Sequence, residues 1–462
     1  MSHSTAFNSL PIELNKAIVH ELDADKDIAT YRLICRATND AIDADKLSFW
    51  RAKYREKYAF KEGVPNNQLQ RKYQRRSRLL RRGVRYDFFR GHKKHELAAI
   101  EILRELIVGM YSGQIETDEH GRPRCKNQTH LLNFIVNSRI LMSARRAPQP
   151  SPGEPDWVHP TLAAVKLICA HFLFELEGAE HRIFALEESQ HAVYQPTNRA
   201  RLYGGPANTT VNMSWILHSM NFFRHHMMNE EAQTLYENIS ELPVTQKPSI
   251  WQERLQQGTR PLSRHWKGTY AFLDNPEIQK FRSQVPGTGV YIDKNIDEGK
   301  IQSLELDFKT QGGELPWPAV FEQRLNSLGH ATAKPGINPQ CRTANTRTGV
   351  KNIQFEGHGE DLDDEFNAIG WLNPLPPQAG IPGWQRITFM KHFMEDFDQL
   401  DQDNLWAYEG VVLPGGRIIL GRWWYASEQV DFNNDYNGPF IWWAIDPDPE
   451  DEDESQSETE EE

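Results

Sequence analysis

Nine short segments between residues 266 and 445 carry the pattern of β-strands, and they limit the possible folds more than any other feature of the chain. Apolar and polar side chains alternate in them, which places the two kinds on opposite faces of a strand, and Gly, Pro and Asn punctuate the intervals. The predicted strands span residues 266–273, 288–293, 300–308, 351–358, 365–372, 384–393, 405–413, 417–424 and 439–445.

The connections between the later strands are short, and Pro414-Gly415-Gly416 predicts a tight hairpin. Strands that follow one another through hairpins form an up-and-down meander, which closes most simply into a barrel. Closure also removes the edges that such aromatic strands otherwise expose to other chains. We therefore expect an antiparallel β-barrel over residues 256–445.

The chain before this region has the periodicity of helices. At 462 residues it is too long for a single core, so several domains are expected. We expect a helical middle region at residues 52–255, with a Pro-rich break near 147–160. One apolar stripe with helical spacing comprises Leu97, Ile100, Leu103, Ile107 and Tyr111. The predicted fold class is accordingly α+β and multidomain.

The charge of the chain is concentrated at its end. The net charge is −12, and residues 446–462 contain 11 acidic residues and no Lys or Arg, so the rest of the chain is nearly neutral. Such a segment is typical of a solvated, disordered acidic tail.

No apolar run in the sequence approaches the length of a membrane span, and the first residues lack the pattern of a signal peptide, so no membrane partner is expected. The four cysteines, Cys35, Cys125, Cys169 and Cys341, are widely spaced, which favours a reducing compartment. We expect the protein in the cytoplasm, the nucleus or both.

The sequence contains none of the catalytic or cofactor-binding motifs that we searched for. It contains no phosphate-binding glycine loop and no nucleophile elbow, and its two His-Glu pairs lack the second histidine of a zinc-protease helix. We therefore expect no catalytic residues, no cofactor and no metal.

Eight Lys and Arg residues lie between Arg71 and Arg85. This pattern fits a solvent-exposed helix face, a nuclear-import signal or a nucleic-acid contact. Aromatic residues do not alternate with the charges as platforms for bases, so nucleic acid is the least favoured of the three.

The first fifty residues contain two short amphipathic helices with more apolar surface than they can bury by themselves. Leu10-Pro11, Leu33-Ile34-Cys35-Arg36 and Trp50-Arg51, at these distances, resemble the F-box motif. The resemblance implies that residues 7–51 form a three-helix module that binds the Skp adaptor and, through it, the cullin and RING subunits of a ubiquitin ligase. The implied adaptor-binding residues are Leu10, Pro11, Leu14, Ile18, Leu22, Leu33, Cys35, Arg36 and Trp50. An ordinary helical hairpin packed on the protein's own core is the alternative.

The C-terminal segments YEGVVLPGGRIILGRWW and GPFIWWAI are similar to those of fungal F-box proteins, and the region resembles a lipocalin-like barrel. These resemblances imply a non-catalytic substrate-recognition subunit of an SCF-type E3 ubiquitin ligase, whose protein target is unknown. The alternatives are a lipocalin-like binder of small molecules with incidental F-box-like helices, and an enzyme that uses the barrel interior.

The pattern of the strands also suggests a target site. In each of the strands 384–393 and 417–424 we assign the more apolar set of side chains to the barrel interior. This assignment places Lys391, Arg422 and Trp424 inside, where the two cations either meet Glu409 or await an anionic group. An internal salt bridge that braces the barrel remains equally open.

Overall fold

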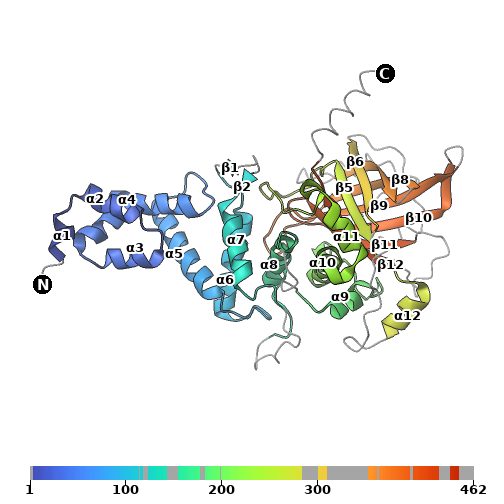
Figure 1. The fold of residues 1–462 in the computed structure, drawn as a ribbon, viewed down its shortest axis with the longest axis horizontal. Coiled ribbons are helices and arrows are strands. Elements are labelled where there is room, and N and C mark those ends of the chain that lie inside the picture. Colours follow the sequence, from blue (N-terminus) through green and yellow to red (C-terminus); the bar gives the residue numbers. More distant parts are fainter. Residues whose placement is uncertain are drawn as a thin grey trace, which may run out of the picture. The chain divides into compact units, whose positions relative to one another are not determined.

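The computed structural model describes residues 4–113, 115–117, 123–142, 155–176, 183–197, 199–283, 300–309, 352–361, 364–395, 399–425 and 437–446 (Figure 1). The chain divides into two compact units. The N-terminal unit consists of residues 1–140 and 252–254, and the C-terminal unit consists of residues 141–251 and 255–462.

The N-terminal unit is helical, as predicted. Its elements are α1 (Ser4–Ser9), α2 (Ile12–His20), α3 (Asp25–Arg32), α4 (Arg36–Lys57), α5 (Asn66–Gly83), α6 (Lys94–Val108), β1 (Glu116–Thr117), β2 (Pro123–Arg124) and α7 (Lys126–Asn137). Pro11 precedes the first residue of α2, where its missing N–H has no intrahelical partner to lose. The backbone of α4 departs from helical geometry at residues 44–47, so this helix consists of two segments joined by a kink.

The C-terminal unit combines helices with the barrel strands. The helical part contains α8 (Pro160–His171), η1 (Phe172–Phe174), α9 (Leu186–Val193), α10 (Met213–Met228), η2 (Glu230–Ala232), α11 (Thr234–Glu241), η3 (Val244–Gln246) and α12 (Asn275–Ser283), with a small sheet of β3 (Tyr203–Gly204) and β4 (Thr210–Val211). The barrel strands are β5 (His265–Tyr270), β6 (Gln302–Lys309), β7 (Ile353–Asp361), β8 (Asp364–Pro374), β9 (Gln385–Glu395), β10 (Gln399–Val412), β11 (Ile418–Tyr425) and β12 (Asn437–Ala444).

The barrel is closed and antiparallel, and each of these strands pairs with its neighbour in sequence. Closure occurs where β12 pairs with β5, with Trp442 opposite Gly268. The predicted meander and its closure are therefore confirmed. Eight of the nine predicted strands are present, and the segment 288–293 lies outside the described residues.

The hairpin between β10 and β11 is also present. The Gly416 N–H donates to the Leu413 carbonyl at 2.9 Å, and both Gly415 and Gly416 have positive φ values, which glycine adopts without strain. A side chain at Gly415 would also collide with Trp251, since a Cβ there would lie 2.2 Å from the Trp251 Cβ.

Aromatic side chains fill the described section of the barrel interior. The Phe389 and Tyr408 rings stack with centroids 4.5 Å apart, and Tyr408 meets Phe440 at 5.0 Å. Gly410 is needed beside them, because a Cβ there would come within 2.9 Å of the Phe440 ring. This section is a packed core built from the protein's own side chains.

The outer faces of β11 and β12 are buried as well. Helix α10 contacts both strands, and in Figure 1 it lies against this side of the barrel. Every residue of β12 and all but the last of β11 are buried. Apolar residues therefore occupy both faces of these strands, as in sheets covered on two sides.

Two further predictions concern the acidic C-terminal tail and membrane-spanning helices. The predicted acidic tail, 446–462, lies outside the described residues apart from Asp446. Among the described helices, none is both long enough and apolar enough to cross a membrane.

Candidate functional site

Helix α2 exposes apolar side chains beside the face that it buries. Asn15 and Val19 are buried one turn apart, whereas Leu14 and Ile18 lie on the neighbouring face with 50% and 37% of their surface exposed. Leucine and isoleucine normally lose their exposure when a helix packs, so this face lacks a cover within the described part of the unit.

The end of α3 adds two more such side chains. Leu33 is 84% exposed and Ile34 is 38% exposed. The hydroxyl of Tyr31 anchors this end to α2, because it donates to Asn15 Oδ1 at 2.7 Å. The four side chains thus belong to one small helical module.

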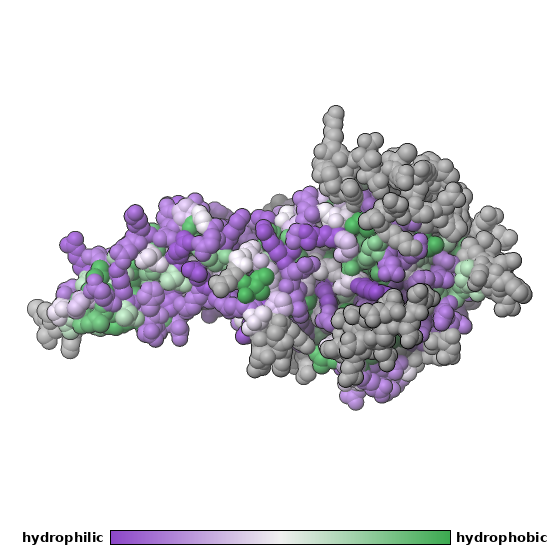
Figure 2. Space-filling model, turned by 90° about the horizontal axis from the view of Figure 1, so that it is seen from above, coloured by the Kyte–Doolittle hydropathy of each residue, from purple (hydrophilic) through white to green (hydrophobic). Residues whose placement is uncertain are grey.

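Exposed apolar residues are concentrated in this module. Of the thirteen large hydrophobic side chains that are exposed in the described chain, five lie within residues 12–34. Figure 2 shows apolar surface (green) gathered at the N-terminal end of the unit among hydrophilic side chains (purple). We call Leu14, Ile18, Leu33 and Ile34 the N-terminal apolar surface.

The other predicted adaptor-binding residues differ in how far they are exposed. Pro11 and Arg36 are exposed, and Arg36 lies 3.7 Å from Asp40 one turn on. Leu10 is half-buried, and Leu22 is half-buried against the core of the unit.

Cys35 and Trp50 have structural contacts. Cys35 caps α4, where its backbone N–H donates to Thr38 Oγ1 at 3.1 Å. The prediction that Trp50 presents a contact surface is wrong, since it is only 5% exposed. Its ring packs between Phe49 and Tyr73 in the core of the unit, because the second segment of α4 turns this side chain toward α5.

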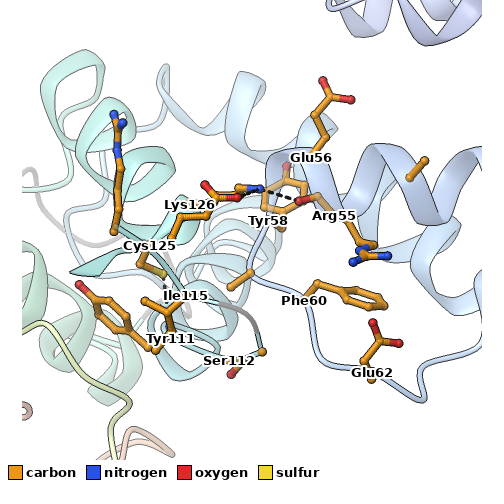
Figure 3. Close-up of a pocket in the computed structure, with 15 residues that line it drawn as sticks. Arg55, Glu56, Tyr58, Phe60, Glu62, Tyr111, Ser112, Ile115, Cys125 and Lys126 are labelled. Carbon is orange, nitrogen blue, oxygen red and sulfur yellow. Dashed lines mark hydrogen bonds and ion pairs between the residues drawn. The ribbon is translucent and has the colours of Figure 1, made fainter. Parts of the chain in front are cut away.

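A cleft of about 580 Å³ lies elsewhere in the N-terminal unit, between the end of α4 and the start of α7 (Figure 3). Lys126 crosses it, with an ion pair to Glu116 at 2.8 Å and a hydrogen bond to the Arg55 carbonyl at 3.0 Å. The Arg55 guanidinium lies 5.4 Å from the Phe60 ring centroid. Charges of both signs line the cleft, so no single ligand charge is selected, and the sequence pattern did not indicate it.

Lys391 lies inside the barrel, as assigned from the pattern of β9. Its ammonium group forms an ion pair with Asp361 and lies 4.2 Å from the Phe366 ring centroid, with Phe393 and Tyr270 farther away. Lys391 does not meet Glu409, which was one of the two predicted alternatives, because Glu409 follows the interior residue Tyr408 on β10 and therefore faces outward. Lys391 instead braces the interior through Asp361 and cation–π contacts.

Arg422 and Trp424 lie on the outer face of the barrel, which corrects their predicted position inside. The alternate residues of β11, Ile419 and Trp423, belong to the interior cluster. Arg422 packs over the Trp215 ring of α10 with its guanidinium 4.6 Å from the centroid. The more apolar face of β11 is the outer one because α10 covers it.

Glu409 also lies on this outer face. Its carboxylate accepts from Arg386 Nε at 3.1 Å and Nη2 at 2.8 Å, and Arg386 lies 5.7 Å from the Tyr203 ring centroid. Burial, followed by the charge of Glu409, raises the pKa of Tyr203 well above its ordinary value. The four residues predicted to form one target site are therefore divided between the interior and the helix-covered face.

Within the described residues, no group of three or more His, Cys, Asp or Glu side chains is placed to hold a metal ion. No family model, no curated protein and no solved structure matches the chain.

Proposed function

We propose that this protein is a non-catalytic substrate-recognition subunit of an SCF-type E3 ubiquitin ligase, which bridges the Skp adaptor and a protein target. The observation that carries the proposal is the N-terminal apolar surface. It lies on the helices whose residues resemble the F-box motif, and an adaptor that covers it would complete the module.

Burial of the exposed side chains would stabilise a complex with the adaptor. Burial of apolar surface contributes roughly 25 cal/mol per Å², and full burial of one Leu or Ile contributes about 1.5–3 kcal/mol. Leu14 and Leu33 are at least half exposed, so each has much of this energy left to gain from a partner. A few such anchors supply most of the affinity of a typical interface.

Through the adaptor, the module would reach the cullin and RING subunits, and the C-terminal unit would hold the target. Such bridging raises the local concentration of target lysines near the charged conjugating enzyme, with no chemistry performed by this chain. We place this activity in the cytoplasm and nucleus.

The packed interior of the barrel supports target recognition over the lipocalin-like alternative. A small-molecule binder needs a cavity of roughly 300–1,000 Å³ for its ligand. The interior cluster around Phe389, Tyr408 and Phe440 occupies that space in the described section. The target would then contact outer surfaces of the protein.

The first prediction tests whether the N-terminal apolar surface binds the adaptor. Leu14→Ala combined with Leu33→Ala should weaken binding to purified Skp adaptor by at least about 2 kcal/mol, or roughly thirtyfold in Kd, because apolar burial is lost at the interface. Isothermal titration calorimetry measures the change. Val136→Ala is the matched control, since Val136 is 47% exposed on α7 of the same unit.

The wild-type chain must bind the adaptor for the proposal to stand. Absence of binding, or equal affinity of the double variant with an unchanged circular dichroism spectrum, would refute it. An effect of Val136→Ala as large as that of the double variant would show that the surface is not specific.

A further inference from the structure

Four arginines form a row along the exposed side of α5, and a fifth follows just beyond the end of the helix. Arg71, Arg75, Arg78 and Arg82 follow one another at intervals of four, three and four residues, and Arg85 follows three residues later, next to the C-cap. This spacing places side chains above one another on a single helix face. All five are exposed, and at 1.5 Å per residue they extend over about 21 Å. We call these five residues the arginine row.

The opposite side of α5 is anchored in the core of the N-terminal unit. Leu69, Tyr73 and Arg76 are buried there. The Arg76 guanidinium donates to the Tyr54 hydroxyl at 2.7 Å and lies 5.1 Å from the Tyr58 ring centroid. The arginine row is therefore displayed by a rigid element.

Few carboxylates balance this charge. Residues 63–95 contain eleven Lys and Arg residues and one acidic residue, Asp87, which pairs with Arg139 at 3.1 Å. Arg75 pairs with Glu105 of α6 at 3.0 Å. The other four arginines of the row have no carboxylate partner in the part of the chain that the structure describes. Like charges one turn apart destabilise a helix. An anionic partner would therefore reduce the repulsion between the arginines of the row.

The chemistry of the row identifies the kind of partner. Arginine is the side chain best suited to carboxylate and phosphate, because its planar fork donates two parallel hydrogen bonds. The apolar face of α5 is buried, so this helix cannot insert into a lipid surface as an amphipathic helix does.

Two observations disfavour nucleic acid. The single aromatic residue of α5, Tyr73, is buried and offers no platform for a base. Outside residues 446–462 the chain is nearly neutral, so it lacks the overall positive charge that attracts a long polyanion.

We propose that the arginine row binds an acidic or phosphorylated segment of the target protein. This inference rests on the proposed function and names the class of substrate. An extended segment at about 3.3 Å per residue needs six or seven residues to cover the row. Carboxylate and phosphate share the required chemistry, and the probes below distinguish them.

The test uses the full chain and fluorescence anisotropy with three labelled probes: a peptide of eight glutamates, the same peptide with two phosphoserines, and a duplex RNA. Arg78→Gln with Arg82→Gln should weaken binding of both peptides at least about tenfold, because two charge-assisted contacts are lost. Lys26→Gln with Lys61→Gln removes the same charge from exposed sites outside the row and should change the affinity less than about twofold.

Equal weakening by the two double variants would overturn the inference, because general charge attraction then explains the binding. Tighter binding of the RNA than of either peptide would also overturn it and make the row a nucleic-acid surface. A stronger effect on the phosphorylated peptide than on the glutamate peptide would support the inference and select phosphate.

Adaptor binding in the same samples reports separately on the proposed function. The arginine variant should bind the Skp adaptor as the wild type does. A chain that binds the acidic peptides through the row but fails to bind the adaptor would refute the proposed function and leave the peptide site supported.

Discussion

At the scale of single residues, the barrel contains buried ion pairs on both of its faces. The Arg386 and Glu409 side chains are 0% and 6% exposed, and they pair on the outer face under the helices. Lys391 and Asp361 form the corresponding pair inside. Such pairs contribute little net stability when intact, but removal of one partner leaves a buried charge without its counterion.

Glu409→Ala should therefore lower the free energy of unfolding by about 3–5 kcal/mol, because Arg386 loses its counterion in a buried site. Urea denaturation followed by tryptophan fluorescence measures the loss. The double variant Arg386→Met with Glu409→Leu should lose less, since no buried charge remains. If the double variant is as unstable as Glu409→Ala, the charge is not the cause.

At the scale of elements, α8 and α10 carry histidines into the interior of the C-terminal unit. His171 of α8 and His226 of α10 are fully buried. Burial, assisted by the charge of Arg417, lowers the pKa of His171 to about 3. Burial, assisted by His225, lowers the pKa of His226 to about 3 as well. Both side chains are neutral in the folded protein.

This burial predicts acid sensitivity. The unfolded chain binds a proton at each histidine near pH 6.5, and the folded chain binds it only near pH 3. The stabilisation is therefore complete above pH 6.5 and is lost as the pH falls toward 3, by up to about 1.4 kcal/mol per pH unit for each histidine.

Denaturation at several pH values tests this dependence. His171→Leu should reduce the slope of unfolding free energy against pH below 6.5. His95→Leu, which replaces an exposed histidine of the N-terminal unit, is the control variant. An equal slope in the wild type and His171→Leu would contradict the assignment.

At the scale of the whole molecule, the chain contains two compact units, and each has its own hydrophobic cluster. The N-terminal cluster includes Val19, Ile42, Phe49 and Tyr73, and it draws on helices from α2 to α6. A unit with its own core is able to fold independently.

A fragment of residues 1–140 should therefore fold on its own, with a helical circular dichroism spectrum and a cooperative thermal transition. Under the proposed function it should also bind the Skp adaptor with the affinity of the full chain. A fragment that melts without cooperativity would show that the unit depends on the rest of the protein.

Much of the architecture could be predicted because its signals are local. The eight barrel strands and the hairpin at 414–416 follow from alternation and turn residues, which act over a few positions. Closure of the meander was predictable too, since hairpins join neighbouring strands and an open edge is costly.

The candidate site was less predictable. Lys391 was assigned correctly, because the two faces of β9 differ in their apolar character. Arg422 and Trp424 were assigned to the wrong face, since α10 covers the outside of β11 and both faces of that strand are buried. Apolar character distinguishes the faces of a strand only where one of them meets water.

The sequence by itself therefore determined the helical character of the region before the barrel, the eight barrel strands with their order, and the spacing of the arginine row, because each depends on neighbours along the chain. Only the tertiary structure decided that Trp50 is buried, that Glu409 pairs with Arg386 and that Leu14 and Leu33 remain exposed. These outcomes depend on which helices and strands pack against one another, and such packing brings together residues that are far apart in the sequence.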